Sequence, residues 1–125
     1  MASGIASYRR AQQDVSPEQL VLLLLRTAVA RLTRLEGLEE PDEQWIKDIH
    51  HVRCILIELR DALDPEVDAD LVTRLSDLYS WCLLELVRAG SDRRPEVVVP
   101  VRKVVEELHE AWVGVMNSNP TPEAV

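Results

Sequence analysis

Two groups of side chains in this sequence have the types and spacing to do chemistry. Glu106 and His109 form a Glu-x-x-His pair, and residues three apart share one face of a helix, as in di-metal helix bundles. Such a site needs a second pair and two further inward carboxylates, whereas the other helical patterns offer apolar residues at inward positions. We interpret the pair as part of a solvated ion-pair face, and we expect no metal and no cofactor.

The adjacent residues His50 and His51 invite comparison with helical bundles that accept a phosphoryl group on one exposed histidine. The bulky context Val52-Arg53-Cys54 lacks the small residues that would leave room for a docking partner, and two adjacent histidines cannot share one helical face. A plain solvent-facing histidine is the alternative interpretation. A histidine phosphotransfer-type bundle stays open as an alternative function. The sequence contains no Gly-rich phosphate loop, Ser/His/Asp set or nucleophile elbow. We therefore do not expect an enzyme.

The composition is typical of one helical globular domain. The chain has 125 residues, of which 46% are hydrophobic and 29% charged, with three Trp, two Tyr and no Phe. A formal net charge of −8 repels phosphate backbones, so we expect no nucleic-acid partner. Cys54 and Cys82 form no CxxC pair, and the longest apolar run, 20–25, is far shorter than the roughly 20 residues that cross a bilayer. We expect a cytoplasmic protein without membrane insertion.

Periodic apolar residues predict four helices. Ser16, Pro17 and Gln19 have the spacing of a capping box with proline at the first helical position. Pro100 and the surrounding valines predict a kink or late start in the last helix. Short connections favour an all-α fold, an antiparallel up-down-up-down four-helix bundle over 16–116. The expected helices span about 17–36, 43–63, 69–89 and 96–116, with a flexible N-terminal arm at 1–15 and a mobile C-terminal tail at 117–125.

These helices carry more apolar surface than one core stripe each can bury. In the first helix Val21 and Leu25 begin the stripe, and a step of about 100° per residue places Leu23 roughly opposite to it. In the third helix the same step places Leu84 about 180° from the stripe through Leu75. The surplus residues are Leu20, Leu22, Leu23, Ile46, Ile57, Trp81, Leu84, Val98, Val105 and Trp112, to which the arm adds Ile5 and Tyr8.

The fourth helix offers two apolar lines. We expect the line through Val97, Val101 and Val104 to face the core, and the line through Val98 and Val105 to face outward. Surplus apolar surface of this kind is typical of a protein that binds an amphipathic partner segment. Self-association is the alternative, because a symmetric dimer would bury the same residues on both copies.

Several segments, in order, resemble the FliS family of flagellin export chaperones over about residues 3 to 113. The family is suggested by a tyrosine-bearing arm before a Ser-Pro-x-x-Leu helix start. The chain departs from the family pattern at Leu25-Arg26-Thr27, at Val67-Asp68-Ala69 and at Ala89-Gly90. The matching residues are Tyr8, Ser16-Pro17-Glu18-Gln19-Leu20, Leu24-Leu25, Ala28-Val29, Ile55-Leu56-Ile57-Glu58-Leu59, Leu63-Asp64, Leu75-Ser76-Asp77-Leu78-Tyr79, Leu86, Ala89 and Glu107-Leu108-His109-Glu110-Ala111-Trp112.

The resemblance implies a cytosolic chaperone that holds the disordered C-terminal segment of flagellin. Such a chaperone prevents premature polymerisation and presents the client to the flagellar type III secretion apparatus, so export-gate components are implied as further partners. The arm with Ile5 and Tyr8 would cover a groove in the free protein and be displaced by the client. A client tail that folds on the surplus apolar surface would lose conformational entropy, which lowers the affinity in coupled folding and binding.

Overall fold

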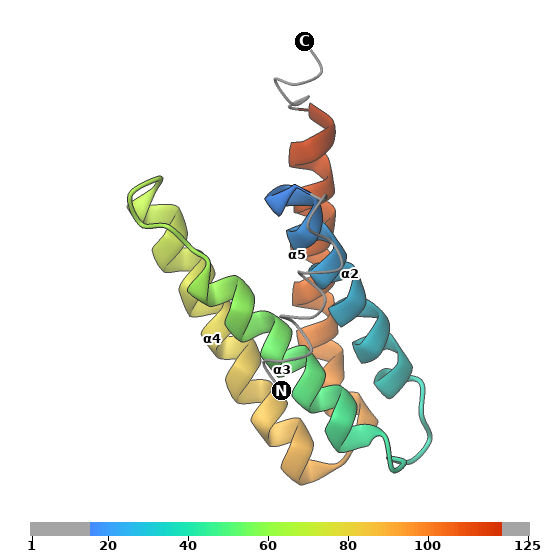
Figure 1. Cartoon of the computed structure of the whole chain (residues 1–125). Coiled ribbons are helices and arrows are strands. Elements are labelled where there is room, and N and C mark those ends of the chain that lie inside the picture. The colour runs from blue at the N-terminus through green and yellow to red at the C-terminus, as the bar shows by residue number, and fades with distance from the viewer. Residues whose placement is uncertain (1–15, 119–125) are drawn as a thin grey trace.

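The described part of the chain, residues 16–118 of the computed structural model, consists of four α-helices and one 3-10 turn (Figure 1). This confirms the predicted all-α, four-helix fold class. The predicted arm at 1–15 and the end of the predicted tail, 119–125, lie outside the described residues. The elements are α2 (Pro17–Glu36), α3 (Trp45–Asp61), α4 (Ala69–Asp92), η1 (Pro95–Val98) and α5 (Val99–Ser118).

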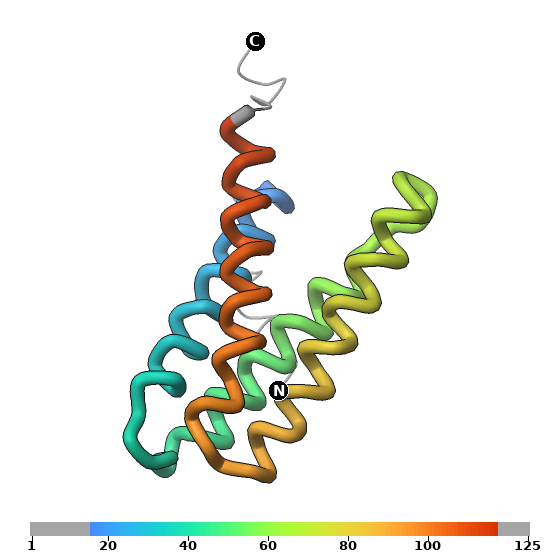
Figure 2. The backbone as a smooth tube through the Cα atoms, turned by 180° about the vertical axis from the view of Figure 1, so that it is seen from behind, coloured from blue at the N-terminus to red at the C-terminus, as the bar shows by residue number. Residues whose placement is uncertain are grey.

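Successive helices run in opposite directions and form two antiparallel pairs. α2 packs along α5, α3 packs along α4, and α2 also packs against α3. The two pairs meet near the α4–α5 turn and diverge toward the α3–α4 turn, as Figures 1 and 2 show from opposite sides. The first turns of α4 therefore receive little cover, and Leu71, one turn before Leu75 of the predicted stripe, is 50% exposed.

Local signals in the sequence explain the helix starts. The Ser16 hydroxyl accepts a hydrogen bond from the Gln19 N–H at 3.2 Å, and the Gln19 side-chain oxygen accepts one from the Ser16 N–H at 3.2 Å. This is the predicted capping box, which satisfies two N–H groups that the helix leaves unpaired. α4 begins in a similar way, with the Asp68 carboxylate accepting from the Leu71 N–H at 3.0 Å.

The predicted irregular start of the last helix is also present. Pro95–Val98 forms the 3-10 turn η1, and the α-helix begins only at Val99. Pro100 then occupies the first turn of α5, where a missing N–H costs no helical hydrogen bond.

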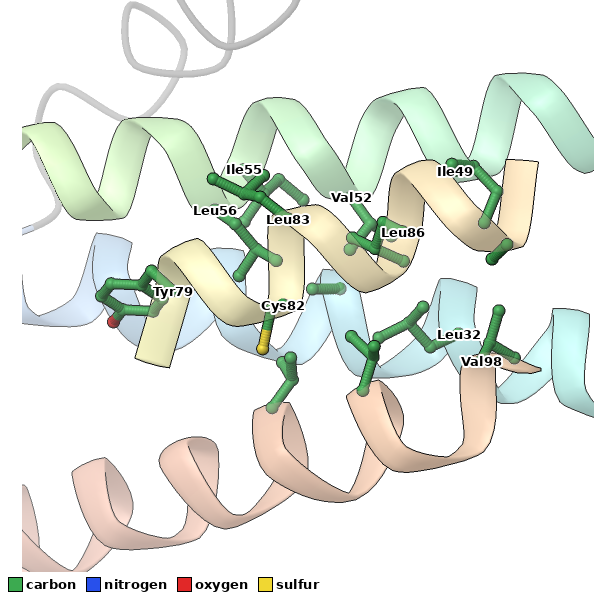
Figure 3. Close-up of a cluster of buried hydrophobic side chains, with 14 of the residues drawn as sticks. Leu32, Ile49, Val52, Ile55, Leu56, Tyr79, Cys82, Leu83, Leu86 and Val98 are labelled. Atoms are coloured by element: carbon green, nitrogen blue, oxygen red, sulfur yellow. The ribbon is translucent and has the colours of Figure 1, made fainter. Parts of the chain in front are cut away.

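The core lies where the two helix pairs meet. Figure 3 shows side chains from α3 and α4 directed toward one another, with Cys82 directed toward α5. The fully buried apolar residues with the largest volumes are Trp45, Leu25, Leu32, Leu35, Ile55, Leu56, Leu86, Val52, Val98, Val101 and Val105.

Two polar contacts hold α3 against its neighbours. The carboxylate of Asp48 is fully buried and accepts from Arg31 at 2.8 Å and from Arg34 at 2.8 Å, which joins α3 to α2. The indole N–H of Trp45 donates to the Ala89 carbonyl at 3.1 Å, which joins the start of α3 to the end of α4. Both contacts satisfy polar groups that would be costly to bury alone.

α4 continues beyond Gly90, the residue at which the sequence suggests its end. Gly90 lies within the helix, and the cap is Arg93, whose φ of 52° and ψ of 44° are left-handed. The Arg93 N–H donates to the Ala89 carbonyl at 3.1 Å, so the left-handed turn satisfies a helix-terminal acceptor.

Replacement of Arg93 by glycine is expected to raise the free energy of unfolding by about 0.5–1 kcal/mol, because glycine adopts this conformation without steric strain. Urea denaturation followed by circular dichroism measures the change. Arg94→Gly is the matched control. It also removes one arginine, but at a φ of −123° where glycine relieves no strain, so it should not stabilise the fold. Equal effects of both changes would contradict the prediction.

Candidate functional site

Four exposed apolar side chains gather on the outer side of the α3–α4 pair. Ile46 is 52% exposed, Trp81 39%, Leu84 68% and Val87 49%. Along α4, Trp81, Leu84 and Val87 follow one another at intervals of three, which makes each the surface neighbour of the next. Ile46 of α3 lies near Val87, since both line the same pocket. We call these four residues the α3–α4 face.

A pocket of about 340 Å³ opens at one end of this face. It lies between the first three turns of α3 and the last two turns of α4. Most of its wall is apolar, but it also contains a guanidinium and a hydroxyl group. The lining residues are Ile46, Ile49, His50, Arg53, Leu86, Val87, Gly90 and Ser91.

A second group of predicted residues lies elsewhere, at the start of α2. Leu20, Leu22 and Leu23 are half-buried there, and Leu20 packs against the core cluster. Trp112 of α5 is half-buried at the same end, and its indole N–H donates to the Glu18 carbonyl at 2.9 Å. The predicted residues therefore occupy two separate places on the bundle rather than one continuous surface.

Two residues predicted to face outward do not. Val98 and Val105 are both 0% exposed, and the outward placement predicted for them is wrong. The apolar arc of this helix is wide, and the line through Val98, Val101 and Val105 is the one that packs inward. Val97 and Val104, expected at the centre of the buried stripe, are only half-buried at its margin.

Of the three remaining predicted residues, Ile57 alone lies in the described part of the chain. Ile57 of α3 is half-buried and packs against the core cluster. Ile5 and Tyr8 lie outside the described residues, and their predicted roles stay predictions.

The residues considered for chemistry are engaged in other contacts. Glu106 accepts from Arg102 at 2.7 Å, as expected of an ion-pair face. Nowhere between residues 16 and 118 do three or more His, Cys, Asp or Glu side chains gather in a way that could hold a metal ion. Burial raises the pKa of Cys82 to about 12, so its thiol stays protonated and unreactive near neutral pH. His50 lies 3.5 Å from the Cys54 sulfur on the surface of α3.

His51 lies near the buried ion pair between α2 and α3. Its partial burial and the nearby Arg31 lower the pKa of His51 below 6.5, against the opposing effect of Asp48. The unfolded chain therefore binds this proton at a higher pH than the folded chain does. It follows that the free energy of unfolding decreases as the pH falls from about 6.5 toward the lower folded pKa.

His51→Gln is expected to flatten this pH dependence, because glutamine takes up no proton. The measurement is urea denaturation of both proteins at about pH 7.5 and about pH 5.5. His109→Gln serves as the control, since it removes a histidine from α5, away from the Asp48 site. If the wild-type protein and His51→Gln lose equal stability on acidification, the assigned cause is wrong.

Sequence reasoning missed several residues of the α3–α4 face and its pocket. Val87 follows Leu84 at the spacing of helical neighbours, so the same angular argument would have found it. Arg53 and Ser91 are polar residues in apolar patterns, and Gly90 directly follows the expected end of the third helix. No local signal reveals that α3 and α4 bring these three residues together.

No helix within the described 16–118 segment is both long and apolar enough to span a bilayer.

Comparison with known proteins agrees with the family resemblance along the chain. The family model described as flagellar protein FliS matches residues 1–119. The chain is 29% identical over 104 residues to the flagellar secretion chaperone FliSB of Pseudomonas aeruginosa, with 82% of each protein covered. It is 28% identical over 119 residues to the flagellar secretion chaperone FliS of Salmonella typhimurium, covering 89% of this chain and 88% of that one. The corresponding protein of Vibrio cholerae is 23% identical over 119 residues, covering 90% and 88%.

These matches extend over nearly the whole chain, and their low identities agree with the departures noted in the sequence. The protein therefore belongs to the FliS family, a family of flagellar secretion chaperones rather than enzymes.

Proposed function

We propose that this protein is a cytoplasmic export chaperone for flagellin. It binds the disordered C-terminal segment of flagellin, prevents its premature polymerisation and delivers it to the flagellar type III secretion apparatus. Export-gate components are the partners that receive the complex. The observation that carries the proposal is the α3–α4 face, a set of exposed apolar side chains on a member of a chaperone family.

Physical considerations support a peptide client over a small molecule. The α3–α4 face spreads along the outer side of α4 and across to Ile46, whereas a small-molecule site encloses most of its ligand. An amphipathic helix covers such a surface with side chains at intervals of three and four residues. The client segment would be disordered before binding and would become helical only on the surface of the chaperone.

Isothermal titration calorimetry with the C-terminal segment of flagellin from the same genome tests the proposal. We expect one-to-one binding with a strongly negative heat-capacity change, because apolar surface is buried and the segment folds. Absence of binding would refute the flagellin assignment. Light scattering distinguishes the alternative: a dimer that persists with peptide present would indicate a self-associating adaptor instead.

A second arm of the experiment tests the residues at the start of α2. If Leu20, Leu22 and Leu23 belong to the client-binding surface, Leu23→Ala should lower the affinity for the flagellin peptide. Unchanged affinity would restrict the client to the α3–α4 face.

A further inference from the structure

The α3–α4 pocket contains a guanidinium, that of Arg53, which forms no ion pair with any residue that the structure describes. The Nε atom of Arg53 is buried and makes no hydrogen bond. Arg31 and Arg102, by contrast, each form an ion pair with an acidic residue of another helix. The guanidinium lines the pocket without an ion pair to a described carboxylate, so an acidic group of a ligand would gain an ion pair there without displacing one.

The walls of the pocket define the chemistry that fits it. Ile46, Ile49, Leu86 and Val87 are apolar, so a bare inorganic anion would lose hydration without gaining contacts on these sides. A volume of about 340 Å³ is at the small end of ligand sites and accommodates one or two side chains. The pocket therefore fits a peptide that presents an acidic side chain beside an apolar one.

Gly90 forms part of the pocket because it has no side chain. A Cβ atom built there would lie 4.0 Å from the Cδ1 atom of Ile46, which is ordinary van der Waals contact. An alanine thus fits without strain, and it favours the helix because glycine in a helix interior costs stability. A longer side chain at this position would extend into the space between Ile46 and Val87.

We propose that this pocket is an acidic subsite within the client-binding surface. A helical segment of the client places an Asp or Glu carboxylate against the Arg53 guanidinium and an apolar side chain, one turn away, against Ile46 and Val87. The charges are complementary, and the pocket is continuous with the α3–α4 face through Val87 and Ile46. This inference rests on the proposed function, because it specifies how part of the flagellin segment is recognised.

The test uses the full chain, the flagellin C-terminal peptide and calorimetry. Arg53→Gln removes the charge but keeps a side chain that forms hydrogen bonds, and we expect about tenfold or greater loss of affinity. Arg74→Gln is the matched control, since it removes an arginine from an exposed position of α4, and it should change affinity by less than about twofold. Equal effects of the two substitutions would overturn the proposal.

Gly90→Leu provides an independent test that does not alter charge. We expect about tenfold or greater loss of affinity because leucine fills the pocket, while thermal unfolding shows that the bundle remains folded. Gly90→Ala should raise the melting temperature and weaken binding by a smaller factor. Unchanged affinity for a folded Gly90→Leu variant would show that the client does not enter the pocket.

Peptide variants identify the acidic partner. Each Asp or Glu of the peptide is replaced in turn by its amide, against both the wild-type protein and Arg53→Gln. One replacement should weaken wild-type binding yet have no further effect on Arg53→Gln, as a coupled pair requires. Additive losses at every position would refute the acidic subsite. If the wild-type protein binds no flagellin peptide at all, the proposed function fails as well, which distinguishes the two results.

Discussion

Replacing Trp45 with alanine is expected to lower the free energy of unfolding by about 3–5 kcal/mol. Trp45 is 0% exposed, so its removal leaves a cavity between the start of α3 and the end of α4. It also removes the hydrogen bond from the indole N–H to the Ala89 carbonyl, which then accepts only from the Arg93 N–H. Urea denaturation followed by far-ultraviolet circular dichroism gives the change without depending on tryptophan fluorescence.

The companion variant Trp45→Phe separates the two contributions. It keeps much of the apolar volume but loses the N–H donor, so a smaller cost of about 1–3 kcal/mol is expected. A loss below about 1 kcal/mol in Trp45→Ala would mean that the α3–α4 contact closes the cavity by moving. Such a result would contradict the view that α3 and α4 are rigidly packed at this end.

Replacing Trp81 with alanine should weaken binding of the flagellin segment by about thirtyfold or more, equivalent to about 2 kcal/mol. Trp81 is 39% exposed in the free protein and lies next to Leu84 along α4. Tryptophan residues that become fully buried in an interface are frequent binding hot spots. Calorimetry measures the affinity, and urea denaturation of the same variant measures stability, which should change by about 1 kcal/mol or less.

Val67→Ala is the control for this substitution. Val67 is 82% exposed in the connection between α3 and α4, outside the α3–α4 face, so its truncation should leave affinity and stability nearly unchanged. If Trp81→Ala unfolds the protein but leaves residual affinity intact, Trp81 is a structural residue rather than a contact. If both variants bind as the wild type does, the client uses another surface.

The secondary structure could be predicted because its signals are local. The first helix was expected at about 17–36, and α2 spans Pro17–Glu36, starting from the capping box of Ser16 and Gln19. The end of α4 could not be placed as well. Gly90 is a common residue at a helix end, yet the helix continues to Asp92 because Arg93 adopts the left-handed cap itself. A residue type that is common at helix ends therefore locates the end only to within one or two residues.

The candidate site was only partly predictable. Ile46, Trp81 and Leu84 were placed outward by angular position, and all three are exposed. Val98 and Val105 were placed outward by the same argument and are buried. The prediction failed on α5 because its apolar arc is wide. A helix with a narrow apolar stripe can face the core in one orientation only, whereas a helix with a wide arc can rotate about its axis by one residue and still bury apolar side chains.

The sequence by itself determined the all-α class, the number of helices and the outward position of Trp81 and Leu84 on α4, because these depend on helical period and capping. Only the tertiary structure decided which line of α5 faces the core, how the two helix pairs diverge, and that Arg53 and Gly90 share a pocket. Those features depend on packing between segments far apart in the chain, and a helical period carries no information about which neighbour will cover each side.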